Sequence, residues 1–303
     1  MRSEYEKQVK LLLKVLPSLN KVDSFALKGG TAINFFVQDF PRLSVDIDVT
    51  YVKLNSRNEA LKHIQNGIDI VSKDIKKRIP ESNLTKQKSG GTVGKLIIWE
   101  NGAQIKLEVN TVLRGSIFEP EEMELSSTLQ NHFETFVAVK TLSKSDLYGG
   151  KICAALDRQH PRDLFDMKVL LDSEGITNEI RKAFLGYLIS HSRPMSELLD
   201  PNTLDINDVY IKEFEGMTEE SNILEDLIEV QHELPKIIAK GLTKNEKEFL
   251  LSFKSGNPDW NLIDVAHLKD LPGVKWKLQN IKKMDKKKHI EAYEKLEICL
   301  GKR

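Results

Sequence analysis

Apolar residues in the first half of the chain follow two different periods. They recur at helical spacing in residues 4–19 and 55–79, which predicts two amphipathic helices. Between these helices, short apolar runs at 25–27 and 45–51 predict strands. The run at 45–51 alternates strictly between apolar and polar residues, so one of its faces should pack on a core while the other stays polar.

A hairpin is predicted further along the chain, where the strands 96–99 and 105–109 flank Asn101 and Gly102. Asn-Gly is a strong hairpin signal, because both central residues of the tight turn need a positive φ. A last short strand is predicted at 137–139. This half of the chain therefore combines a small sheet with flanking helices.

The second half contains one helical pattern after another. Helices are predicted at 146–158, 161–171, 177–190, 219–240, 243–253 and 275–300. The fold class is accordingly α+β, with a small mixed sheet and flanking helices followed by a helical C-terminal domain. We place the core domain at 1–140 and the helical domain, which would complete an active-site cleft, at 141–303.

The amino-acid composition limits the class of protein but does not assign a function. The 303 residues hold 45 Lys and Arg against 45 Asp and Glu, so bulk charge does not point to nucleic acid. The two cysteines are far apart and have no metal-ligand spacing, which fits a reducing compartment. No apolar run is long enough to cross a membrane, and the charged N-terminus is unlike a signal peptide, so we expect a soluble cytoplasmic protein.

Three carboxylates are candidates for a metal site. Asp46 and Asp48 lie two apart on one strand and so share a face, while Glu108 occupies the same apolar-acid-apolar pattern on the predicted strand 105–109. Mg²⁺ prefers hard oxygen ligands, and a cation would relieve the repulsion between anions held this close. The alternative is a polar strand face in water.

A glycine turn precedes these acids. Gly29 and Gly30 lie between a predicted strand and a short predicted helix, and glycine lets backbone N–H groups approach a phosphate closely. Thr31 could cap that helix and contact a phosphate oxygen. A plain strand-to-helix turn remains the alternative, and the spacing is not that of a P-loop.

Taken together, these motifs resemble a known family. The chain resembles the nucleotidyltransferases related to DNA polymerase β, and within them the AbiEii/AbiGii toxins of type IV toxin–antitoxin systems, over roughly residues 20–175. The matching segments are Leu27-Lys28-Gly29-Gly30-Thr31, Arg42-x-Ser44-x-Asp46-Ile47-Asp48-Val49, the run from Lys151 to Arg158, and the run from Pro161 to Asp166.

This resemblance implies an activity and its partners. It implies transfer of a nucleotide from a nucleoside triphosphate with Mg²⁺ (or Mn²⁺), an RNA or tRNA acceptor, and a separate cognate antitoxin. It assigns the metal-holding pair to Asp46 and Asp48, the helix lysine to Lys151, and the final acidic motif to Asp163 and Asp166.

Residues of the second half are also compatible with simpler roles. Lys151 and Arg158 are seven apart and share a helix face, either toward triphosphate oxygens or as a solvated basic stripe. Asp163 could stabilise the first turn of its helix. Asp166, one turn deeper, could orient Lys151 or accept a proton from the attacking hydroxyl.

Other functions remain open at this point. The enzyme could nucleotidylate a protein or a small molecule, or the fold could bind a nucleotide without catalysis and act through a partner. An Asp-x-Asp glycosyltransferase is a weaker alternative. The basic stretch 275–289, which includes Trp276 and Lys277, would suit an RNA backbone but equally a solvated helix face.

Overall fold

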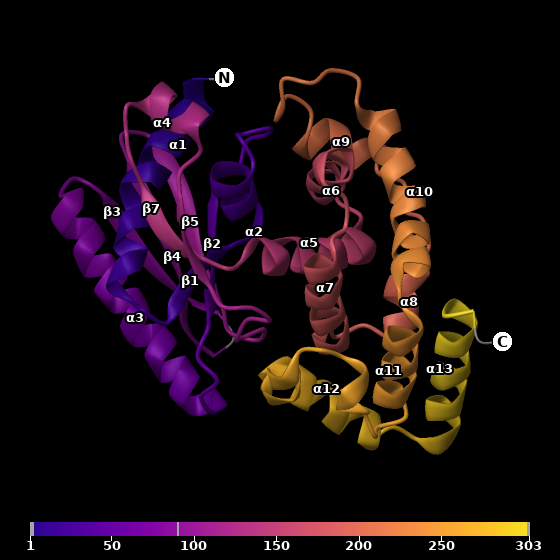
Figure 1. Ribbon diagram of the computed structural model, residues 1–303. Helices are drawn as coiled ribbons and strands as arrows, with labels where there is room; N and C mark the ends of the chain where they lie inside the picture. The colour runs from indigo at the N-terminus through magenta and orange to yellow at the C-terminus, as the bar shows by residue number, and fades with distance from the viewer. Residues whose placement is uncertain (1–2, 90, 302–303) are drawn as a thin grey trace. The chain divides into compact units, whose positions relative to one another are not determined.

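The computed structural model describes residues 3–89 and 91–301. The chain divides into two compact units, Met1–Leu147 and Tyr148–Arg303, and the boundary falls inside one helix, α5 (Lys144–Arg158). The first unit holds a mixed sheet with helices and the second is helical (Figure 1). The predicted α+β class is confirmed.

The sheet of the first unit has seven strands in the order β3-β4-β5-β2-β1-β7-β6. Its two central strands, β1 and β2, are antiparallel to each other, and each has a parallel partner on its other side, β7 and β5 respectively. The strands are β1 (Phe25–Lys28), β2 (Asp46–Tyr51), β3 (Asn83–Ser89), β4 (Thr92–Glu100), β5 (Ala103–Asn110), β6 (Glu121–Glu124) and β7 (Ala138–Thr141).

Two of these strands were not predicted, and both lie at the edges of the sheet. β3 carries a single large apolar residue, Leu84, and β6 is acidic at three of its four positions. Edge strands tolerate such polar sequences, because one side of the strand faces no neighbour. The predicted hairpin turn is confirmed, since Asn101 and Gly102 have φ values of 49° and 79°.

One face of the sheet packs on the helices of the first unit. Ile47, Val49 and Tyr51 of β2 are fully buried, which confirms the predicted core side of this strand. Helix α1 packs against β5 and α3 against β4. The helices of this unit are α1 (Ser3–Val15), α2 (Gly29–Ala32), α3 (Arg57–Arg78) and α4 (Ser127–Phe133), with a 3₁₀ turn at Leu16–Lys21 and a π-helical turn at Ile33–Val37.

The second unit consists of short helices. The stretch 275–300 is helical as predicted, and it is divided into two helices, because Asp285 accepts hydrogen bonds from two backbone N–H groups and so starts a new helix. After α5, the helices are α6 (Pro161–Ser173), α7 (Asn178–Ser190), α8 (Met195–Leu199), α9 (Asn207–Glu213), α10 (Leu224–Gly241), α11 (Lys244–Lys254), α12 (Pro272–Lys282) and α13 (Lys286–Cys299), with 3₁₀ turns at Trp260–Leu262 and Ala266–Asp270.

None of the helices in the described part of the chain combines the length and the apolar character needed to cross a membrane.

Adjacent glycines in α5 have different surroundings. A Cβ atom on Gly149 would lie 2.6 Å from the backbone nitrogen of Phe184 in α7, whereas the nearest atom to a Cβ on Gly150 is 3.7 Å away, in the ring of Tyr187. Gly149 is therefore required by the close approach of two helix backbones. Gly150 is not required by its surroundings.

This contrast gives a matched pair of variants. We expect Gly149→Ala to lower the free energy of unfolding by about 1–3 kcal/mol through overpacking. Gly150→Ala should instead be neutral or stabilise by up to about 1 kcal/mol, because alanine favours a helix interior. Denaturant unfolding of both variants measures the difference, and equal effects would contradict the packing seen between α5 and α7.

Candidate active site

The predicted carboxylates meet on the polar face of the sheet. Asp48 of β2 is the direct neighbour of Glu108 on the parallel strand β5, as the predicted pattern requires. In the same row, Lys28 lies beside Asp48 and Lys95 beside Glu108. Because neighbouring strands are about 4.8 Å apart, these four side chains form one line of charge across four strands.

Two lysines partly neutralise this acidic face. Lys106 Nζ lies 3.7 Å from both Asp46 Oδ2 and Glu108 Oε2, and Lys95 Nζ lies 3.4 Å from Glu108 Oε2. The sequence analysis missed both lysines. Lys106 could have been found, because it stands two residues before Glu108 on the same strand and therefore points to the same face.

The donor chemistry of this face suits a hard cation, but the side chains are not gathered around one. Asp46, Asp48 and Glu108 supply the carboxylate oxygens that Mg²⁺ prefers. Within residues 3–89 and 91–301, however, no group of three or more His, Cys, Asp or Glu side chains is arranged to hold a metal ion. The ammonium of Lys106 lies within ion-pair distance of two of the three acids, so a metal ion there would compete with it.

The glycine turn lies directly against the acids. Gly29 has a φ of 76°, and a Cβ atom on it would lie 2.8 Å from Asp48 Oδ2. A Cβ atom on Gly30 would lie 2.8 Å from an Arg42 guanidinium nitrogen and 3.0 Å from Ser44 Oγ. The positive φ of Gly29 favours a glycine there, whereas the close contacts at Gly30 are with the side-chain ends of Arg42 and Ser44.

Thr31 has a different role from the predicted one. Its side chain is 1% exposed, and its hydroxyl donates a hydrogen bond of 2.5 Å to the carbonyl of Asp46 and lies 2.9 Å from Ser44 Oγ. The predicted helix cap is wrong, because the helix begins at Gly29 and Lys28 is its N-cap residue. Thr31 instead ties the glycine turn to the start of β2.

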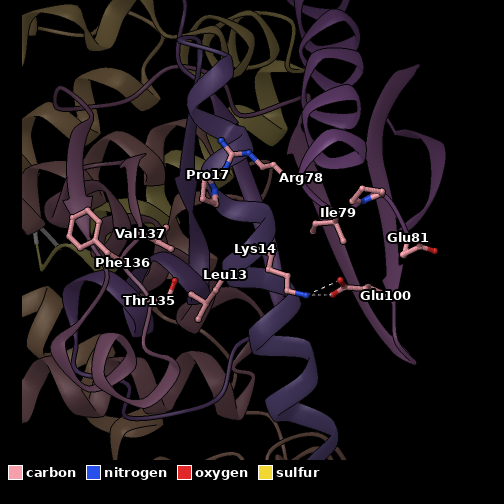
Figure 2. A pocket seen from close by; sticks show the side chains of 11 residues that line it. Leu13, Lys14, Pro17, Arg78, Ile79, Glu81, Glu100, Thr135, Phe136 and Val137 are labelled. Atoms are coloured by element: carbon pink, nitrogen blue, oxygen red, sulfur yellow. Dashed lines mark hydrogen bonds and ion pairs between the residues drawn. The ribbon is translucent and has the colours of Figure 1, made fainter.

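A pocket of the first unit lies apart from these residues. It has a volume of about 530 Å³, and Figure 2 shows the Lys14–Glu100 ion pair at its wall. Its other lining residues come from α1, the 3₁₀ turn that follows it, residues 78–81 at and after the end of α3, and residues 135–137. None of the predicted site residues lines this pocket, so it does not enter the candidate site.

The second unit brings together the predicted lysine and acids. Lys151 Nζ lies 2.8 Å from Asp163 Oδ1 and 2.9 Å from Asp166 Oδ2, which places both acids on the lysine-facing side of α6. Arg158 also contacts the Asp163 carboxylate, through two of its guanidinium nitrogens. The Lys151, Asp163 and Asp166 side chains are almost fully buried, whereas that of Arg158 is 62% exposed.

Charge pairing keeps Asp163 ionised in this buried place. Burial by itself raises the pKa of Asp163, but Lys151 and then Arg158 outweigh it and hold that pKa well below its usual range. A buried carboxylate needs such partners, because an isolated charge is strongly disfavoured in the interior. The network therefore has a structural role in addition to any part in catalysis.

One lysine of the basic C-terminal stretch does not face solvent. Lys277 is 8% exposed, and its ammonium donates to the backbone carbonyls of His191, Ser192 and Arg193, just beyond the end of α7. Burial, together with the nearby Lys254, lowers the pKa of Lys277 to about 8. The predicted stacking candidate, Trp276, is 48% exposed.

Comparisons with known proteins identify relatives of this chain. The family model for the nucleotidyl transferase AbiEii toxin of type IV toxin–antitoxin systems matches residues 10–280. MenT4, a nucleotidyltransferase toxin from Mycobacterium tuberculosis, has a similar structure with a TM-score of 0.59 and 13% identity, covering 92% of this chain and 95% of its own. At this identity the structural likeness shows the fold alone. No curated protein sequence matches the chain.

Removing Lys151 should destabilise the second unit. In Lys151→Met, Asp163 and Asp166 lose their shared buried cation, and we expect the free energy of unfolding to fall by about 3–5 kcal/mol. Arg158→Met is the control: its side chain is exposed, so we expect a loss of about 1 kcal/mol. Equal losses in chemical denaturation would show that Lys151 is not the main counter-ion of the two acids.

Proposed function

The chain belongs to the AbiEii family of nucleotidyl transferase toxins and is a nucleotidyltransferase, and we propose that it moves a nucleotide from a nucleoside triphosphate to an acceptor hydroxyl on RNA. The observation that carries this proposal is the direct pairing of Asp48 with Glu108, with Gly29 against the Asp48 carboxylate. Attack on the α-phosphate of a nucleoside triphosphate needs carboxylates, together with a backbone that approaches the phosphates closely at the same place.

In the proposed site, Asp46, Asp48 and Glu108 hold a divalent cation, Mg²⁺ or Mn²⁺. Such an ion would neutralise the charge that develops on the phosphate oxygens. The backbone at Gly29 and Gly30 would lie along the triphosphate, and Thr31 would support that turn from inside, through its bond to β2. The acceptor oxygen bonds to the α-phosphorus as the bond to pyrophosphate breaks, and the hydroxyl proton passes to a carboxylate.

In the second unit, Asp163 and Asp166 set the position of the Lys151 ammonium, and Arg158 contacts the same Asp163 carboxylate. Two contacts of about 2.9 Å from buried carboxylates leave the lysine little rotational freedom. In this position Lys151 serves as the counter-ion of the two buried acids.

The family suggests which acceptor and which protein partner to test first. We take tRNA as the first RNA acceptor to test, and a cognate antitoxin as the protein partner. The even balance of acidic and basic residues gives no bulk attraction to RNA, so any RNA contact must come from local groups.

Replacing the central acid tests catalysis directly. We expect Asp48→Asn to lower nucleotidyl transfer by about 10³-fold, since a lost cation ligand removes several kcal/mol of charge stabilisation. Asp69→Asn, which alters an acid on the surface of α3 that pairs with Lys86, is the matched control and should keep full activity.

The assay offers labelled triphosphates with purified tRNA, total RNA or a protein extract as acceptors. Label in tRNA supports the proposal. Label in protein alone would show that the acceptor is not RNA. Equal nucleotidyl transfer by Asp48→Asn and the wild type would show that Asp48 takes no part in the reaction.

Lys106 should act as a competitor of the metal ion. We expect Lys106→Met to bind Mn²⁺ about 3–10-fold more tightly than the wild type, because the ammonium contributes roughly 0.2–1 kcal/mol to each of its two ion pairs. Metal-free Lys106→Met should also melt at a lower temperature, because its carboxylates repel one another. Titration with Mn²⁺ followed by electron paramagnetic resonance measures the affinity, with Lys140→Met in β7 as the control. Unchanged or weaker Mn²⁺ binding would contradict this role.

A further inference from the structure

A buried arginine of the first unit has no counter-ion among the residues that the structure describes. Arg114 is 8% exposed, and its one hydrogen bond to the described residues runs from Nη1 to the backbone carbonyl of Ser56, at a long 3.4 Å. Its Nε is buried without a partner among residues 3–89 and 91–301. Most buried polar groups in proteins are paired, and a buried unpaired charge is costly, so this exception calls for a physical reason.

The surroundings of Arg114 are positive. Ser56 is the N-cap of α3, a helix of 22 residues whose N-terminus carries a partial positive charge. Arg57 is the first residue of this helix, and after burial it is the next cause that lowers the pKa of Arg114. The nearby carboxylate of Glu59 is engaged in the capping box with Ser56. The helix N-terminus and Arg57 therefore destabilise the charged guanidinium of Arg114 unless an anion binds beside them.

The loop that carries Arg114 is held firmly in place. On one side Asn110 Oδ1 accepts two backbone hydrogen bonds of 2.9 Å from the start of the loop. Next to Arg114, the N–H of Gly115 donates to the carbonyl of Tyr51 at 2.9 Å. Beyond it, the Asp146 carboxylate accepts two backbone N–H groups at 2.8 Å each. The backbone around Arg114 is therefore fixed, and the burial of its side chain limits the positions open to the guanidinium.

We propose that Arg114, together with Arg57 at the N-terminus of α3, forms a phosphate-binding site. A phosphate accepts the paired N–H donors of a guanidinium in a planar, two-point geometry, and helix N-termini favour anions. The site is distinct from the acidic face, because the strand alternation points Tyr51, which lies near Arg114, and Asp48 to opposite sides of β2.

The position of this site favours the backbone of an acceptor nucleic acid as the source of the phosphate. Tyr51 stands three residues beyond Asp48 on β2, a separation of roughly 10 Å along the strand. A single strand whose end lies at the acidic face could place an internal phosphate at this rim of the sheet. This choice of source rests on the proposed function, whereas the phosphate site itself does not.

The experiment measures binding, without turnover, for the wild type, Arg114→Met and Arg78→Met. Arg78 lies at the other end of α3 and is paired with Asp74, so its replacement controls for the loss of one positive charge. The probe is a labelled single-stranded oligoribonucleotide, titrated at several salt concentrations. We expect Arg114→Met to bind about tenfold more weakly, and its logarithmic salt slope to fall by about 0.7, the contribution of one phosphate contact. Arg78→Met should keep the wild-type slope.

A second measurement separates a binding role from a structural one. In buffer without phosphate or sulfate, Arg114→Met should melt at or above the wild-type temperature, because it removes an uncompensated buried charge. Pyrophosphate should then raise the melting temperature of the wild type and leave that of Arg114→Met unchanged. A variant that melts well below the wild type in anion-free buffer, or one that pyrophosphate stabilises as much as the wild type, would overturn the proposal.

The two measurements also distinguish the sources of the phosphate. If pyrophosphate stabilises the wild type through Arg114 while RNA binding is unchanged in Arg114→Met, the site holds the phosphates of a free nucleotide. If both probes depend on Arg114, the site accepts a nucleic-acid backbone. Absence of nucleotidyl transfer by the wild type would remove the proposed function but leave these binding results standing.

Discussion

Repulsion between like charges governs the first unit of this protein. Asp46, Asp48 and Glu108 are held on one face of a sheet by strand register, and the register is fixed because the opposite face of the same strands is buried. The acids cannot move apart without moving the core. Lys106 of β5 and Lys95 of β4 partly neutralise them in the structure, so positive charge already lies against this face.

The same constraint explains the residues around the glycine turn. Gly29 must lack a side chain because the Asp48 carboxylate occupies the space that a Cβ atom would need. Thr31 fastens this turn to β2 through the carbonyl of Asp46, so the position of the turn follows the position of the acids. The family motif is thus a set of mutual contacts, in which each residue limits where the others can lie.

The charged network of the second unit is buried, unlike the exposed acidic face of the first. There Lys151 and two acids are buried together, and their pairing is complete enough to hold the pKa of Asp163 low. Ion pairs on the exposed acidic face contribute little to stability, whereas the buried network loses several kcal/mol when one partner is removed. Arg114 belongs to neither class, since it is a buried charge whose partner is still to be supplied.

Local pattern in the sequence determined much of this picture. Strict alternation in β2 predicted its core side and its acidic side, and the same pattern around Glu108 predicted a neighbour for Asp48, because side chains on a strand alternate whatever surrounds them. The Asn101-Gly102 turn was predictable because its dihedral angles suit few other residues. The family resemblance, drawn from residues 20–175, is confirmed by a match that extends to residue 280.

Only the tertiary structure decided the rest, because it depends on contacts between residues far apart in the chain. The polar edge strands β3 and β6 exist through their neighbours and have no apolar pattern of their own. Thr31 donates a hydrogen bond to the start of β2, Lys277 is a buried donor, and Gly149 lies at the contact between two helices. The spacing of residues along the sequence does not reveal the partners of any of the three. Arg114 looks like any basic loop residue in the sequence, and burial without a counter-ion is a property that only the folded chain can give it.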